Sequence, residues 1–173
     1  TSSFGIILTI VPAYLNDKGM DATDVLYLFF AFGISRVISL ALAGKFAKRT
    51  SQTLIAATLA VSIGLAISVV ADSIITFGIA LVLMGFGFSI FFPLTLEIIL
   101  SKTKKGISGK IIGAYETIFG LGWAVGPTIG GPITQSFGDE TPYIIFSIIG
   151  IGITILAIIS RKKLEPLKIQ EGQ

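Results

Sequence analysis

The chain has 173 residues, of which 53% are hydrophobic and only 13% are charged, and its mean hydropathy is +0.89. That charged fraction is about half of what soluble domains carry, so a soluble globular fold is excluded. Because the sequence contains neither Cys nor His, disulfide frameworks, thiolate or imidazole metal sites, and catalysis by a His base or a Cys nucleophile are also excluded. We therefore expect no enzyme activity, no cofactor and no metal centre.

Six apolar segments follow one another along the chain, at residues 4–15, 25–43, 54–71, 74–100, 111–137 and 143–159. The first is shorter than the roughly 20 residues that cross a bilayer, and residue 1 is not Met, so we expect a longer protein whose first helix is truncated here. Backbone amides in lipid must be bonded within their own segment, so such uniform runs predict helices. The sequence predicts an all-α membrane protein with a six-helix transmembrane domain over residues 1–160.

The connections between these segments alternate in charge. Basic residues gather at 44–51, at 101–110 and in the polar C-terminal tail at 161–173, whereas the intervening turns are acidic apart from Lys18. Because Lys and Arg in short loops stay on the cytoplasmic side, the basic loops and the tail are predicted to be cytoplasmic in a protein of the cell membrane. A pI of about 9.2 would suggest nucleic acid binding in a soluble chain. Here the basic residues lie beside the anionic headgroups of the membrane, so we expect no nucleic acid partner.

Glycine and proline are concentrated in the fifth segment. Three glycines at fourfold spacing, Gly122, Gly126 and Gly130, form a stripe that allows another helix to approach closely. Pro127 follows Gly126 and interrupts the helical hydrogen bonds, which allows a bend. Plain helix packing explains this pattern as well as a functional motif does.

The complete spacing in this segment, Gly113-x8-Gly122-x3-Gly126-Pro127-x2-Gly130-Gly131, resembles the antiporter motif of the major facilitator superfamily. The stretch Gly-Lys-Phe-Ala-Lys-Arg at 44–49, and Gly85-Phe-Gly87 with Pro93, resemble the same superfamily. This resemblance implies one half of a twelve-helix secondary transporter that binds a small molecule, and in many cases protons, and works by alternating access.

Two departures from the family pattern indicate which half this is. Lys48 stands where loops of N-terminal halves normally carry an Asp, and the fourth segment lacks the Arg that N-terminal halves often have there. The resemblance therefore implies the C-terminal six-helix half, whose partner is an N-terminal half outside this chain. The N-terminal half is the alternative.

Three ionisable residues lie inside apolar segments, where a charge is expensive and marks a functional candidate. Arg36 and Glu116 both lie roughly 12–17 Å from the membrane entries, near the midplane. Arg36 either attracts an anionic substrate in a cavity or neutralises a carboxylate. Glu116 either carries the coupled proton, because a carboxyl group in hydrocarbon can load and release a proton near neutral pH, or is the structural partner of Arg36.

The third ionisable residue, Glu97, lies one turn from the predicted cytoplasmic exit. The family resemblance implies a gating salt bridge between Glu97 and Lys45, Lys48 or Arg49 that closes the cytoplasmic side of the transporter. The alternative is that Glu97 simply ends a helix in solvent.

Aromatic side chains and prolines leave the cargo open between several classes. Seven phenylalanines face either a lipophilic substrate or lipid and neighbouring helices: Phe29, Phe30, Phe32, Phe86, Phe88, Phe91 and Phe92. Pro12 and Pro93 either kink gating helices or are ordinary membrane-helix prolines. The antiporter-like spacing favours export of lipophilic compounds. Two alternatives stay open: uptake of an organic anion, suggested by Arg36, and a channel or non-transporting membrane scaffold.

Overall fold

The computed structural model describes residues 2–103 and 106–164, and the described chain is helical without a strand. The prediction of an all-α fold is confirmed. The helices, in chain order, are α1 (Ser2–Thr9), α2 (Val11–Asp17), α3 (Ala22–Ala41), α4 (Ala43–Phe46), the 3₁₀ helix η1 (Ala47–Arg49), α5 (Thr50–Val70), α6 (Ile74–Ser101), α7 (Ser108–Phe137), α8 (Thr141–Ile159) and the 3₁₀ helix η2 (Arg161–Leu164).

Four helices in the described part of the chain are long and apolar enough to cross a membrane: Ala22–Ala41, Ala43–Val70, Ile74–Ser101 and Thr141–Ile159. Helix α7 has 30 residues but is less apolar because of its many glycines, its prolines and Glu116. Helices α1 and α2 have 8 and 7 residues. Length and composition therefore support four of the six expected spans in the described residues, and the count of six stays a prediction.

The predicted segments differ from the helices by a few residues at their ends, and two of them differ most. The segment at 4–15 is divided at Ile10 into α1 and α2, because Pro12 has no N–H to donate to the preceding turn. The segment predicted to begin at residue 54 begins at Thr50. Thr50 and Thr53 are buried there, and their hydroxyls donate to carbonyls of the basic connection, Thr50 to Ala47 at 2.8 Å. This bonding makes the polar stretch helical.

The turns on one side of the bundle begin helices with side-chain caps. Asp21 accepts hydrogen bonds from the backbone of Thr23 and Asp24 at 2.8 and 2.9 Å, and Ser73 and Thr76 form a second capping box. Gly138, with φ of 96°, ends α7 in a backbone conformation that side chains rarely adopt. The acidic turns of the sequence are thus short, well-defined helix boundaries.

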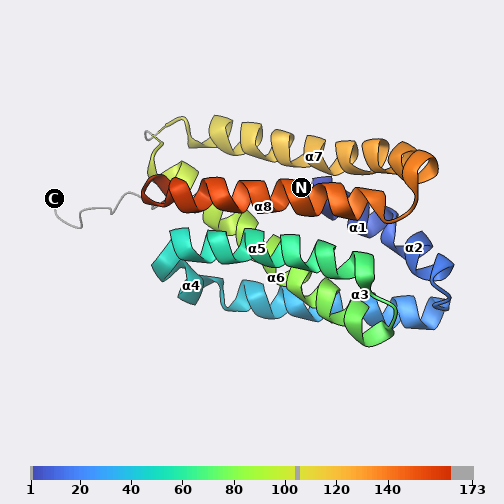
Figure 1. The fold of residues 1–173 in the computed structure, drawn as a ribbon. Coiled ribbons are helices and arrows are strands. Elements are labelled where there is room, and N and C mark those ends of the chain that lie inside the picture. Colours follow the sequence, from blue (N-terminus) through green and yellow to red (C-terminus); the bar gives the residue numbers. More distant parts are fainter. Residues whose placement is uncertain (1, 104–105, 165–173) are drawn as a thin grey trace.

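The connections lie at two ends of an elongated bundle (Figure 1). Residues 18–21, 71–73 and 138–140 share one end, and residues 42–49, 102–103, 106–107 and 160–164 share the other. We call these the acidic end and the basic end. The alternation of charge along the sequence therefore becomes a separation of charge in space.

The bundle core forms where α5 packs on α6 and α8, and α3 on α6. Glycines bring these helices together: a Cβ on Gly64 would lie 2.8 Å from the carbonyl oxygen of Ala80, and one on Gly85 would lie 2.8 Å from that of Phe32. Large apolar side chains remain exposed on the outside, for example Ile159 at 74% on α8. Close glycine contacts inside and apolar side chains outside are typical of helices packed in lipid.

Candidate functional site

Helix α7 contacts α1 through glycines on both helices. A Cβ on Gly126 would meet the backbone of Ser2, with the carbonyl carbon at 2.9 Å, and one on Gly130 would lie 2.9 Å from Cδ1 of Ile10. On the opposite side of this contact, a Cβ on Gly5 would lie 2.9 Å from Cδ of Pro127. Gly126 and Gly130 are the buried residues of α7, so this glycine contact is its principal attachment to the bundle.

The glycine and proline motif of α7 is divided between two environments. Gly126, Pro127 and Gly130 take part in the glycine contact, whereas a Cβ on Gly113 or Gly131 would meet no atom within 4 Å. Gly122 is a half-buried residue of the same helix. Sequence reasoning did not single out Gly5, although a glycine near the start of a membrane segment is a recognisable signal for close packing.

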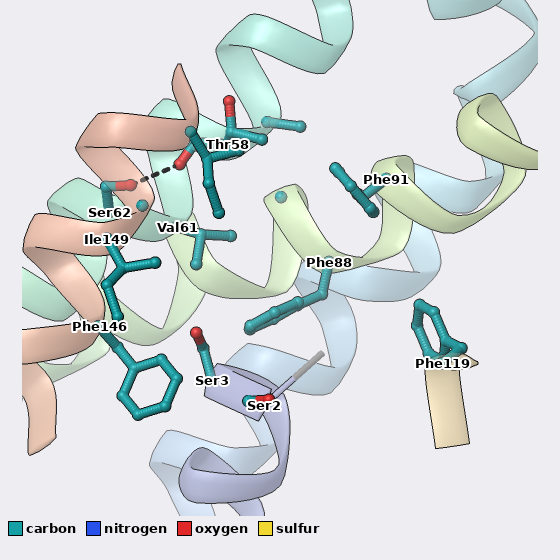
Figure 2. Close-up of a pocket in the computed structure, with 14 residues that line it drawn as sticks. Ser2, Ser3, Thr58, Val61, Ser62, Phe88, Phe91, Phe119, Phe146 and Ile149 are labelled. Atoms are coloured by element: carbon teal, nitrogen blue, oxygen red, sulfur yellow. Dashed lines mark hydrogen bonds between the residues drawn. The ribbon is translucent and has the colours of Figure 1, made fainter. Parts of the chain in front are cut away.

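An apolar cavity of about 230 Å³ lies between α1, α5, α6, α7 and α8. Figure 2 shows the rings of Phe88, Phe119 and Phe146 around it. Two of its four hydroxyl groups are bonded within their own helix: Ser62 Oγ donates to the carbonyl of Thr58 at 2.9 Å, and Thr58 donates to backbone carbonyls. Ser2 and Ser3 supply the other two hydroxyl groups, and the rest of the lining is mostly apolar. The cavity therefore offers hydrocarbon and aromatic surface and suits an apolar group.

Two of the seven predicted phenylalanines, Phe88 and Phe91, line this cavity. Phe92 packs beside it, with its ring centroid 5.0 Å from that of Phe119. Phe119 and Phe146 were missed because neither lies in a run of closely spaced phenylalanines. The other predicted phenylalanines lie elsewhere, either packed on neighbouring helices or exposed: Phe29, Phe30, Phe32 and Phe86.

The two charged residues predicted near the midplane, Arg36 and Glu116, lie on helices that pack against different neighbours. Arg36 is half-buried on α3, with its guanidinium carbon 5.7 Å from the ring centroid of Phe32, and α3 packs against α6. Glu116 is exposed on α7. Its neighbours on the same helical face, Gly113 and Gly120, have open space beside them. Glu116 thus lies on a smooth outer face of the bundle.

The residues of the predicted gating salt bridge are exposed. Lys45 is in α4, Lys48 and Arg49 are in η1, and Glu97 is near the end of α6. Within residues 2–103 and 106–164, no ion pair joins Glu97 to these three cations. The salt bridge stays a prediction.

An ion pair lies at the acidic end, where sequence reasoning noted Lys18 only as an exception to the charge pattern. Lys18 Nζ donates to Glu140 Oε1 at 2.9 Å and lies 5.5 Å from the ring centroid of Tyr14. The hydrogen bond to Glu140 raises the pKa of Lys18 above its usual value. This pair connects the end of α2 to the turn between α7 and α8.

Comparisons with known proteins were made for the whole chain. The sequence profile of the Major Facilitator Superfamily matches residues 1–172. The quinolone resistance protein NorA of Staphylococcus aureus is 24% identical over 162 residues, which are 90% of this chain and 40% of NorA. The human MFS-type transporter SLC18B1 is 43% identical over 47 residues, 27% of this chain and 10% of that protein. The chain thus spans about two fifths of the length of NorA.

Proposed function

Because this chain belongs to the major facilitator superfamily, we propose that it forms the C-terminal six-helix half of a secondary transporter that moves a small molecule across the cell membrane. In this proposal residues 1–160 form the transmembrane domain and residues 161–173 a cytoplasmic tail. Its partner is an N-terminal half, and the two halves rock around a midplane cavity in alternating access. The lengths of the relatives, more than twice that of the matched region, support the presence of such a partner.

The cavity of α1, α5, α6, α7 and α8 carries the proposal that the cargo is lipophilic. Four aromatic rings line it, from Phe88, Phe91, Phe119 and Phe146. The lining is mostly apolar, and Thr58 and Ser62 are already bonded to backbone carbonyls, so a polar cargo would replace few of its hydrogen bonds to water. The similarity to a protein named for quinolone resistance also supports export of an aromatic, lipophilic compound.

For energy coupling we favour protons, with Glu116 as the carrier. Its carboxyl group lies on the exposed face of α7 between two glycines, a position that the proposed midplane cavity would hydrate. Glu116→Gln keeps the size and removes the titration, so it should abolish pH-driven transport and leave exchange at equal pH intact. Organic anion uptake through Arg36 is the second candidate, and its half-buried guanidinium group is the observation that favours it.

The cargo proposal is tested with the full transporter in lipid vesicles and a fluorescent lipophilic substrate. An aromatic contact contributes about 1 kcal/mol, so Phe88→Ala should weaken apparent substrate affinity about fivefold. Phe30→Ala is the matched control, because Phe30 is 66% exposed on α3, outside the cavity.

Equal effects of Phe88→Ala and Phe30→Ala would remove the cavity from substrate binding. Preferential transport of organic anions, abolished by Arg36→Gln, would instead support the second candidate. Ion currents far above carrier rates would identify a channel, and absence of any flux from the reconstituted full protein would favour a scaffold.

A further inference from the structure

The short helix η2 is held against the basic end of the bundle. Lys102 at the end of α6 donates through Nζ to the backbone carbonyl of Lys163, and Leu164 packs on an apolar cluster that includes Leu54 of α5 and Ile98 of α6. Helix α5 also contacts η2 directly. The chain after α8 is therefore a packed part of the fold up to residue 164.

This packing brings cations of three connections to one apolar cluster, because Ala47 of η1 packs against the same cluster as Leu164 of η2. They are exposed residues of η1, of the end of α6 and of η2, which together we call the basic cluster: Lys48, Arg49, Lys102, Arg161, Lys162 and Lys163. In the described part of the chain no carboxylate forms an ion pair with any of them. Like charges brought together repel one another, so an anion bound here is favoured electrostatically.

The surroundings of the basic cluster indicate the kind of anion. Ile158 and Ile159, directly before η2, are 51% and 74% exposed on α8, a helix apolar enough to span a membrane. A phospholipid presents a phosphate immediately beside hydrocarbon, and the cations of η2 directly follow the end of this apolar helix. We propose that the basic cluster binds the headgroup of an anionic phospholipid, with its acyl chains against the end of α8.

The experiment titrates phosphatidylglycerol into the full transporter in a neutral detergent and measures binding by native mass spectrometry. Each cation near a lipid surface contributes about 1 kcal/mol, so Arg161→Gln and Lys162→Gln should each weaken binding about fivefold. Lys110→Gln is the matched control, because Lys110 is equally exposed at the basic end of α7, a helix that packs mainly on α1. It should change binding less than twofold.

Phosphatidylcholine with the same chains, and inorganic phosphate, are titrated in parallel. Weak binding of both supports a site that needs an anionic headgroup and hydrocarbon together. Equal binding of phosphatidylcholine would overturn the role of the cations, and equal binding of inorganic phosphate would identify a site for a soluble anion. Equal losses in Lys110→Gln and Arg161→Gln would show diffuse attraction to the whole basic end, which also overturns the proposal.

Discussion

Among the individual residues of α7, two glycines five positions apart have opposite surroundings. A Cβ on Gly126 would meet the backbone of Ser2, whereas one on Gly131 would meet no atom within 4 Å. A backbone neighbour cannot move aside as a flexible side chain can, so the space at Gly126 is set by how closely α1 and α7 approach. The glycine and proline motif of α7 thus contains a position that requires glycine and another that does not.

Gly126→Leu should therefore separate α1 from α7. Overpacking of a well-packed contact costs about 1–3 kcal/mol, so we expect a lower melting temperature of the detergent-solubilised full transporter and strongly reduced transport. Gly131→Leu introduces the same side chain on the same helix and should leave both nearly unchanged. If the two variants behaved alike, the glycine contact would have no special role in packing α7.

Among the elements, α2 is attached to the acidic end by contacts with α5, with α8 and with the turn between α7 and α8. The hydroxyl of Tyr14 donates to the carbonyl of Ser68 on α5 at 3.1 Å, and its ring centroid lies 4.9 Å from that of Tyr143 on α8. Lys18, just beyond α2, is paired with Glu140 at 2.9 Å. The first apolar segment is interrupted at Ile10, close to Pro12. These contacts nevertheless pack α2 firmly against the bundle.

The ion pair at the end of α2 predicts a pH-dependent stability. Glu140 raises the pKa of Lys18 above its usual 10.5, so the stabilisation is fully present below pH 10.5 and is lost as the pH rises through the raised pKa. Because the pair is solvated, we expect Lys18→Gln to lower the melting temperature only slightly at neutral pH, and high salt to remove the difference.

The matched control is Asp72→Asn, which removes a charge from an exposed residue at the same end. It should not change the dependence of melting temperature on alkaline pH. A wild-type curve that coincides with that of Lys18→Gln from pH 8 to pH 11 would show that the pair contributes nothing to stability.

At the scale of the whole molecule, the fold places all acidic turns at one end and all basic connections at the other (Figure 1). Within each end, one contact joins parts of the chain that are distant in the sequence. Lys18 with Glu140 joins two turns at the acidic end, and Lys102 with the carbonyl of Lys163 joins two connections at the basic end. A bilayer would therefore meet one predominantly basic and one predominantly acidic surface, the pattern that the positive-inside rule describes.

The predicted orientation can be measured by cysteine labelling in intact cells, and this chain contains no native Cys. Cysteines at the exposed positions Lys45 and Ile107 should resist an impermeant thiol reagent added outside, whereas those at Ala22 and Asp72 should react. All four should react after the membrane is permeabilised, which controls for accessibility. The reverse labelling pattern would place the basic end outside and overturn the proposed cytoplasmic tail.

The candidate site was predictable where it depends on local pattern. Gly126, Pro127 and Gly130 were identified from spacing alone and lie in the contact with α1, and Phe88 and Phe91 line the cavity. Their partners were not predictable, because Gly5, Phe119 and Phe146 come from segments that meet them only after folding. The roles of Arg36, Glu116 and Glu97 stay predictions, since they depend on the other half and on other states of the transporter.

The sequence by itself determined the helical membrane class, the family and the alternation of charge, because hydropathy, glycine spacing and loop charge are properties of consecutive residues. Only the tertiary structure decided that α1 packs on α7, that Lys18 pairs with Glu140, and that η2 returns to the basic end. The physical reason is that apolar helices in lipid have no hydrophobic preference for one neighbour over another. Their pairing depends on matching small-residue surfaces and a few polar contacts between residues far apart in the chain.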